Sequence, residues 1–94
     1  MEQEIGLLKD AIERGEVDLT IQKIDELLST PNIETKKDYL YYLRGNAYRK
    51  KSNWKEALDS YQCAIDLNPQ SPAVQARQAA LEILEFFHKD MYNQ

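Results

Sequence analysis

The sequence is poor in residues that make tight turns or cross-link a chain. Its 94 residues include three glycines, three prolines and one cysteine. So few turn-forming residues disfavour the many short strands of a β-sandwich or barrel. The single Cys63 cannot close an internal disulfide, which agrees with a reducing compartment. We therefore expect an all-α fold and a cytoplasmic location.

Long hydrophobic runs and an excess of positive charge are also missing. The uncharged runs are too short to span a bilayer. The first residues, MEQEIGLL, are acidic where a signal peptide would carry basic residues. The chain has 12 Lys and Arg against 16 Asp and Glu, a formal net charge of −4. This balance disfavours attraction to nucleic acid or to an anionic membrane, so we expect neither as a partner.

Residues that carry catalysis are equally scarce. The chain has no glycine-rich phosphate loop and no cysteine pair, and His88 is its one histidine. Cys63 lies in a predicted helix with no motif that would orient His88 as its base. The acids between Glu13 and Glu26 lack the spacing of a calcium-binding loop and are typical of a solvated face. We expect no catalytic site, no metal site and no cofactor.

The stretch 38–69 has the pattern of two antiparallel helices. Apolar and small residues recur at steps of three and four along both halves, which places them on helical stripes. Asn53 and Glu56 form a capping box that starts the second helix at Trp54. Asn68 and Pro69 end that helix. The pattern predicts a tight helical hairpin.

The order of small and aromatic residues in this hairpin follows a known signature. These residues are Tyr41, Gly45, Tyr48, Ala57, Tyr61, Ala64 and Pro69. Gly45, Ala57 and Ala64 allow the helix axes to approach closely, with tyrosines filling the space beside them. The pattern resembles the tetratricopeptide repeat (TPR) family, whose helix–turn–helix unit has about 34 residues. Arg44 stands where the family usually has Leu, and Ser52 where it often has Gly.

The resemblance implies antiparallel helical hairpins stacked as a short right-handed superhelix of about five helices. Residues 1–30 repeat the hairpin pattern weakly, with two predicted helices over about 2–14 and 17–29. A shift of 37 residues lays Gly15 on Ser52 and Leu8 on Gly45. Because the signature residues themselves are replaced, two interpretations stay open. Residues 1–30 are either a degenerate repeat or a plain helical hairpin.

A last helix is predicted over 72–91. Ser71, followed by proline, is a clear start signal, and the helix would cover the end of the stack. Its apolar residues are too many for one stripe, and Phe86, Phe87 and Met91 cannot all face inward. Two outcomes stay open. Either this apolar surface meets a partner or a second copy of the chain, or the tail folds across the hairpins and is buried.

A further stripe on the first helix of the central hairpin supplies candidate groove residues. They are Tyr39, Tyr42, Asn46, Arg49 and Lys50. In TPR proteins the corresponding stripe lines a concave groove that holds a peptide or helix. Asn46 stands where some members hydrogen-bond the ligand backbone or its terminal carboxylate. Arg77 and Lys9 would add cations from neighbouring helices, whereas Tyr42 and Leu43 stand where a full carboxylate clamp has Lys or Asn.

Two functions from different classes follow. The first is a non-catalytic interaction module or scaffold, formed by residues 1–94 as one domain, that binds an acidic or carboxylate-ended segment of a protein in the groove. The second is a structural self-assembly unit in which Phe86, Phe87 and Met91 hold a homodimer.

Overall fold

Five α-helices make up the described part of the chain. The computed structural model describes the backbone of residues 2–30 and 36–92, and side chains as far as residue 87. The helices are α1 (Glu2–Glu13), α2 (Val17–Ser29), α3 (Lys37–Lys50), α4 (Trp54–Leu67) and α5 (Ala73–Tyr92). These ranges contain no strand, and the predicted all-α class is confirmed. No helix within them is long and apolar enough to cross a membrane.

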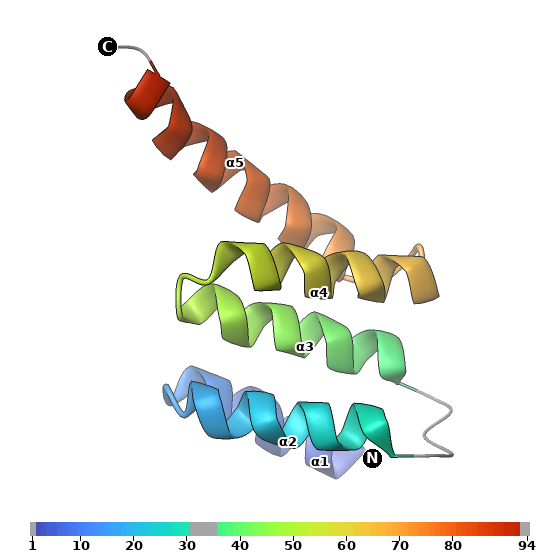
Figure 1. The fold of residues 1–94 in the computed structure, drawn as a ribbon. Coiled ribbons are helices and arrows are strands. Elements are labelled where there is room, and N and C mark those ends of the chain that lie inside the picture. Colours follow the sequence, from blue (N-terminus) through green and yellow to red (C-terminus); the bar gives the residue numbers. More distant parts are fainter. Residues whose placement is uncertain (1, 31–35, 93–94) are drawn as a thin grey trace.

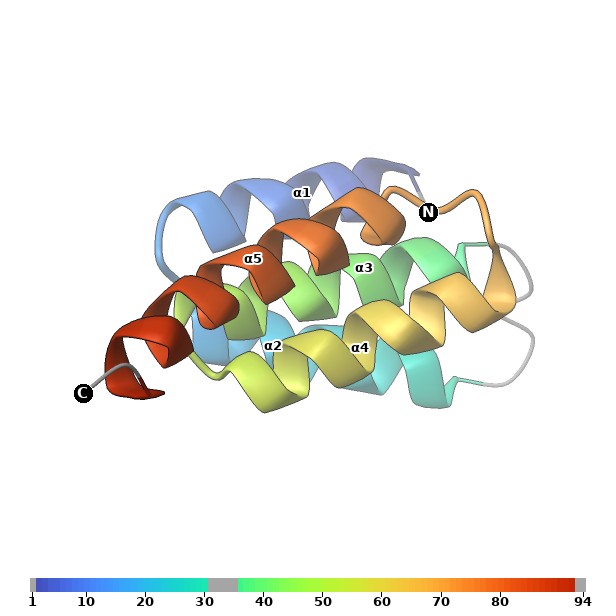
Figure 2. The ribbon, with the colours of Figure 1, turned by 90° about the horizontal axis from the view of Figure 1, so that it is seen from above.

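The helices are stacked as hairpins. α1 and α2 form one antiparallel pair, α3 and α4 form the next, and α5 packs on the second pair (Figure 1). From above, α1, α3 and α5 lie toward one side of the molecule, and α2 and α4 toward the other (Figure 2). α3 contacts both helices of the first hairpin, just as α5 contacts both helices of the second. One packing relation therefore repeats along the stack, as predicted.

Gly45 allows the helices of the central hairpin to approach each other. A Cβ atom added to Gly45 would lie 2.4 Å from Cε1 of Tyr61. The ring of Tyr61 therefore occupies the place of the missing side chain. Tyr61, Ala57 and Ala64 are all fully buried. The predicted close approach is confirmed, with the tyrosine ring lying on the glycine itself and not beside it.

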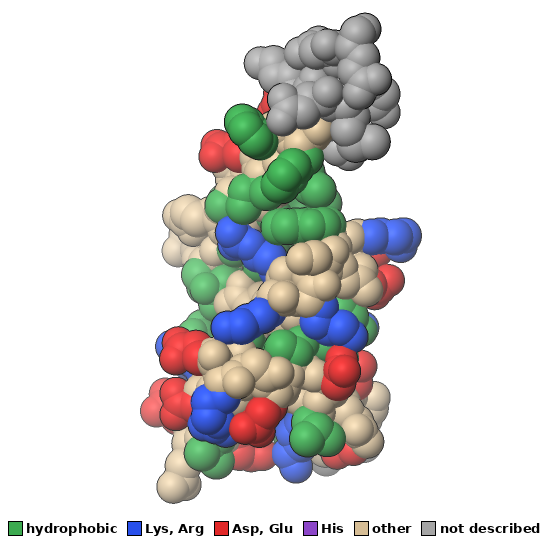
Figure 3. Space-filling view, turned by 90° about the vertical axis from the view of Figure 1, so that its left-hand side faces the viewer, with side chains coloured by type: hydrophobic (Ala, Val, Ile, Leu, Met, Phe, Trp, Pro, Cys, Tyr) green, Lys and Arg blue, Asp and Glu red, His purple; other side chains and the backbone are tan. Residues whose placement is uncertain are grey.

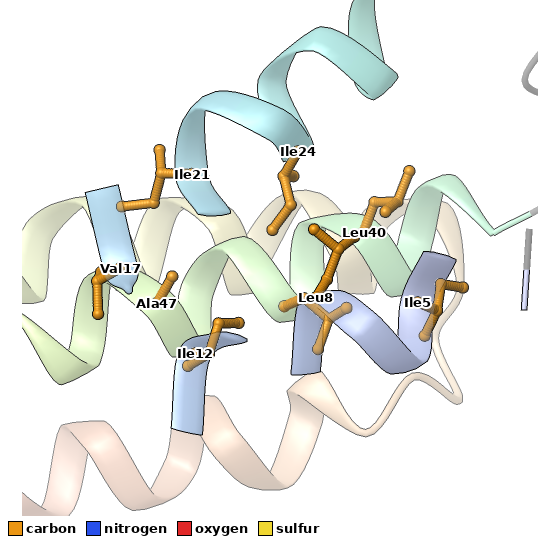
Figure 4. Packing of buried hydrophobic residues seen from close by; sticks show 9 residues of the cluster. Ile5, Leu8, Ile12, Val17, Ile21, Ile24, Leu40 and Ala47 are labelled. Carbon is orange, nitrogen blue, oxygen red and sulfur yellow. The ribbon is translucent and has the colours of Figure 1, made fainter. Parts of the chain in front are cut away.

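The first hairpin is joined to α3 by an aliphatic core. Its members come from α1, α2 and α3 at helical spacing: Ile5, Leu8, Ile12, Val17, Ile21, Ile24, Leu40, Leu43 and Ala47. Side chains of α1 and α2 point toward one another and toward α3 (Figure 4). Burial of such side chains contributes about 1.5–3 kcal/mol each. This core fixes the position of α3, which carries most of the candidate groove residues.

The two interhelical turns share one backbone conformation. Gly15 and Ser52, which are 37 residues apart, both have positive φ, at 89° and 64°. In each turn this residue's amide donates to the carbonyl three residues earlier, and the following amide donates to the carbonyl five residues earlier. The N–O distances are 3.0 and 3.0 Å in the first turn and 2.8 and 2.9 Å in the second. This pair of hydrogen bonds is the Schellman motif with which many helices end, so it is compatible with both interpretations of residues 1–30.

α5 begins at a capped and tightly packed end. The amide of Ala73 donates to Oγ of Ser71 at 3.0 Å, so the predicted cap is present and the helix starts one residue later than expected. Ala73 and Ala80 are fully buried against the central hairpin. Small residues here allow α5 to approach α4 closely.

The other end of α5 leaves the stack. Its C-terminal half projects obliquely beyond α4 (Figure 1). Phe86 and Phe87 are 64% and 55% exposed, and their rings pack edge to face at 5.9 Å. The idea that the tail folds across the hairpins is therefore wrong for these two residues. The side chain of Met91 lies outside the described residues.

Candidate functional site

Two hollows meet at Asn46 on α3. The first, called the aromatic hollow, has a volume of about 120 Å³ and lies between α1 and α3. Its lining comprises Lys9, Ile12, Glu13, Tyr39, Tyr42, Leu43 and Asn46. The second, called the basic hollow, has a volume of about 470 Å³ and is lined by Asn46, Arg49, Lys50, Trp54 and Ile83. Because Asn46 lines both, one extended segment crossing α3 there would enter both hollows.

The aromatic hollow offers ring surface and balanced charge. The rings of Tyr39 and Tyr42 lie 5.3 Å apart, and Tyr42 lies 6.3 Å from the buried ring of Tyr61. Lys9 and Glu13 on α1 contribute one charge of each sign to the lining. The predicted proximity of Lys9 to the tyrosine stripe is therefore observed, and Glu13 cancels its charge. This hollow suits an apolar side chain better than a carboxylate.

Asn46 has a partner within the fold that sequence reasoning missed. The hydroxyl of Tyr61 donates to Oδ1 of Asn46 at 2.6 Å. Burial raises the pKa of Tyr61, and the nearby Arg49 opposes that shift. The phenol therefore stays protonated and holds the amide of Asn46 in place. The amide nitrogen of Asn46 is the group that can donate to a ligand.

The basic hollow has two cations and an apolar wall. Arg49 forms no ion pair within the described part of the chain. Lys50 Nζ donates to the backbone oxygen of Glu13 at 3.2 Å, which also links α3 to the end of α1. Trp54 and Ile83 supply apolar surface, and no acidic side chain lines the hollow. From the turn side of the stack, Lys and Arg side chains lie below the hydrophobic surface of α5 (Figure 3).

Arg77 stands apart from both hollows. It lies on α5 and is part of the lining of neither one. Its side chain is half-buried, and Nε is buried without a hydrogen-bond partner among the described residues. The structure thus brings together Tyr39, Tyr42, Asn46, Arg49 and Lys50 on α3, and leaves Arg77 outside this group.

Arg44, which stands where the family usually has Leu, has a structural role that the sequence did not indicate. Its Nε donates to Asp25 Oδ1 at 2.8 Å, and its NH1 group donates to Ser60 Oγ at 2.7 Å. The guanidinium also lies over the ring of Tyr48, 4.9 Å from its centroid. Burial lowers the pKa of Arg44, but the hydrogen bond and charge of Asp25 outweigh this effect and raise it. One side chain therefore connects α2, α3 and α4.

The acidic surface of the first hairpin is only partly a solvated face. Asp25 pairs with Arg44, and Asp18 pairs with Lys51 at 2.6 Å. Asp18 stays 82% exposed despite its pairing, so it belongs to a solvated face as predicted, whereas Asp25 is 48% exposed and its hydrogen bond with Arg44 is partly buried. The partners are separated by 19 and 33 residues. Partners so far apart along the chain leave no helical periodicity by which the sequence could reveal the pairing.

No metal site is visible in the part of the chain with described side chains. No group of three or more His, Cys, Asp or Glu residues there could hold an ion. Cys63 is exposed on α4. The side chain of His88, considered above as a base for Cys63, lies outside the described residues.

Comparison with known proteins gives two likenesses. The family model for the tetratricopeptide repeat matches residues 39–71. The whole chain is similar to Bacteroides fragilis protein BF1650, whose structure was determined in solution by NMR. The identity is 48%, the match covers 100% of this chain and 92% of that one, and the TM-score is 0.85. A search of curated proteins gives no match.

Proposed function

The chain belongs to the tetratricopeptide repeat family, and from this premise we propose that it is an interaction module that binds a protein segment across α3. The observation that supports this proposal is the pair of hollows that share Asn46. The proposal treats residues 1–94 as one domain in which 1–30 are a degenerate repeat, 38–69 a full repeat and α5 the terminal helix. We further propose that the protein acts in the cytoplasm and has no catalytic role.

The chemistry of the two hollows sets the orientation of the segment. An apolar side chain would contact Tyr39 and Tyr42 in the aromatic hollow. The amide nitrogen of Asn46 would donate to a backbone carbonyl or a carboxylate at the crossing point. Arg49 and Lys50 would attract a carboxylate, from an acidic side chain or a C-terminus, by charge-assisted hydrogen bonds. Arg77 would contact only a longer segment that continues toward α5.

The expected interaction is modest in strength. The two hollows are small and open, so we expect the interface to belong with the weak, transient complexes that bury less than about 1,200 Å². Loss of one charge contact should therefore have a large relative effect on capture.

Affinity capture from cell lysate, followed by mass spectrometry, tests the proposal. Arg49→Glu should lose the partner because it reverses the charge of the basic hollow. Lys55→Glu is the matched control, since Lys55 lies on α4 with 82% of its side chain exposed and makes the same charge change away from the hollows. Equal recovery of the same proteins by both variants and the wild type would contradict the proposal.

Asn46→Ala provides a second test of the crossing point. The variant should weaken capture, but it also removes the acceptor of the Tyr61 hydroxyl and should lower stability by about 1 kcal/mol. Thermal unfolding by circular dichroism must therefore show that it is folded at the capture temperature. A folded Asn46→Ala protein that captures partners as well as the wild type would exclude Asn46 from the site.

A second candidate function is self-assembly through α5. It rests on the exposure of Phe86 and Phe87 on a helix that projects from the stack, with Met91 predicted to extend the surface. Two neighbouring exposed aromatic rings are typical of an interaction surface. Sedimentation equilibrium should show association that Phe86→Ser weakens. A wild-type protein that stays monomeric at high micromolar concentration would exclude this function.

A further inference from the structure

An apolar hollow lies at the opposite end of the stack from α5. Its volume is about 270 Å³, and all its lining residues belong to α1, α2 or the turn between them. Leu7 and Leu19 stand at its edges, 65% and 70% exposed. They are more exposed than any other large hydrophobic side chain that the structure describes. A repeat stack normally ends in a polar face, so this end hollow needs an explanation.

The rim of the end hollow carries two acids and two bases. Near the turn, Arg14 Nε and Glu16 Oε2 lie 3.0 Å apart and neutralise each other. At the open end are Glu4 on α1 and Lys23 on α2, and neither forms an ion pair within the described residues. At a rise of 1.5 Å per residue they lie about 16 Å and about 12 Å from the turn, within one helical turn of each other.

We propose that the end hollow is a self-association surface and that its occupant is the same hollow of a second copy of the chain. A twofold axis along the hairpin lays α1 of each copy over α2 of the other. Glu4 of each copy then faces Lys23 of the other, and the exposed leucines of both copies are removed from water.

Charge and symmetry favour this occupant. Each copy carries a net charge of −4, which opposes association over most of the surface. The rim is locally neutral and its two free charges are self-complementary under a twofold rotation. A pair formed in this way is closed, whereas docking of this hollow on α5 of another copy would continue into an open chain of molecules.

The size of the surface predicts a weak dimer. Two helices of this length, packed side by side, cover a patch of about 20 Å by about 20 Å. The buried area is therefore at the lower end of specific interfaces, and we expect a dissociation constant on the order of 100 µM. Association should be visible between about 10 µM and about 1 mM.

Sedimentation equilibrium over that range tests the proposal. Leu19→Glu should weaken association at least tenfold, because it places a charge in the centre of the apolar contact. The variant should keep its fold, since Leu19 is 70% exposed, and a thermal melt by circular dichroism checks this. Lys55→Glu, a charge change at an 82% exposed side chain on α4 and away from the end hollow, should leave the dimer unchanged.

Charge reversal tests the proposed arrangement. Glu4→Lys and Lys23→Glu should each weaken self-association several-fold, because like charges then face each other. An equimolar mixture of the two variants should associate as well as the wild type, since every facing pair is again of opposite sign.

A wild-type monomer at about 1 mM, or a dimer lost in Phe86→Glu but kept in Leu19→Glu, would overturn the proposal. If the mixture of Glu4→Lys and Lys23→Glu does not regain the wild-type strength of association, the twofold arrangement is overturned. Neither result bears on peptide capture by α3, which Arg49→Glu tests separately.

Discussion

The interhelical turns of the two hairpins have the same conformation, but the helices of the two hairpins pack differently. Gly15 and Ser52 occupy equivalent turns with the same hydrogen bonds. At the positions of Gly45 and Tyr61, however, the first hairpin has Leu8 and Ile24, which are both buried in its aliphatic core. α3 and α4 contact each other more extensively than α1 and α2 do. The same hairpin backbone is therefore compatible with two distributions of side-chain volume, and a glycine facing a tyrosine ring gives the closer helix packing.

Gly45→Ala should lower stability more than any other exchange of one small residue for another in this chain. Its Cβ would lie 2.4 Å from a ring carbon of the fully buried Tyr61, so helix or ring must move. We expect a loss of about 2–4 kcal/mol in the free energy of unfolding, measured with urea. Gly6→Ala is the matched control, since no atom lies within 4 Å of its added Cβ, and it should stabilise α1 by about 0.5–1 kcal/mol. Similar effects at the two glycines would contradict the close packing.

Transfer of the first hairpin's residues to the second tests whether the two packings are interchangeable. Gly45→Leu alone should be strongly destabilising, and Tyr61→Ile alone should leave a cavity. The double variant should be more stable than the sum of the two single losses predicts, with a coupling energy above about 1 kcal/mol in a double-mutant cycle. Additive losses would show that the two positions do not share one space.

Exchange of the turn residues should give a smaller effect of opposite sign in the two hairpins. Ser52 has φ 64°, a conformation that favours glycine. Ser52→Gly should raise the free energy of unfolding by about 0.5–1 kcal/mol, and Gly15→Ser should lower it by about 1 kcal/mol. Thermal unfolding of both variants gives the measurement. Equal signs would mean that the two turns are not equivalent.

The smallest effect concerns alkaline pH. Burial raises the pKa of Tyr61 above the value of about 10 for an unfolded tyrosine, so the unfolded chain loses this proton first. The stability that this pKa difference contributes is complete below pH about 10 and is lost as pH rises above it. Unfolding free energy should therefore fall less steeply above that pH in Tyr61→Phe than in the wild type. The equivalent position of the first hairpin holds Ile24, which does not titrate and adds no such pH dependence. Equal pH slopes of the unfolding free energy in Tyr61→Phe and the wild type would contradict the raised pKa of Tyr61.

Local signals accounted for the helices. Asn53 caps α4, with Oδ1 accepting from the amide of Glu56 at 3.4 Å, and α4 has the predicted bounds. Gly45 and Tyr61 are separated by about four helical turns of sequence yet form one contact, which the repeat signature encodes as a pair. Leu67, the last residue of α4, is apolar but 56% exposed.

The site was less accessible to sequence reasoning because it depends on distances between helices. The stripe on α3 was predictable from helical spacing. The division into two hollows was not, because it requires the separation of α3 from α1 and from α5. The ties of Lys50 to Glu13 and of Arg44 to Asp25 cross between hairpins and leave no periodic trace. The exposure of Phe86 depends on the angle at which α5 leaves the stack.

Proton NMR of the intact chain tests the packing that positions α3 and its hollows most directly. If the ring of Tyr61 lies on Gly45, the α protons of Gly45 are shifted upfield by the ring and show strong nuclear Overhauser effects to its aromatic protons. Gly45 α protons at unperturbed shifts, with no such contacts to Tyr61, would contradict the packing and with it the placement of Asn46 between the two hollows.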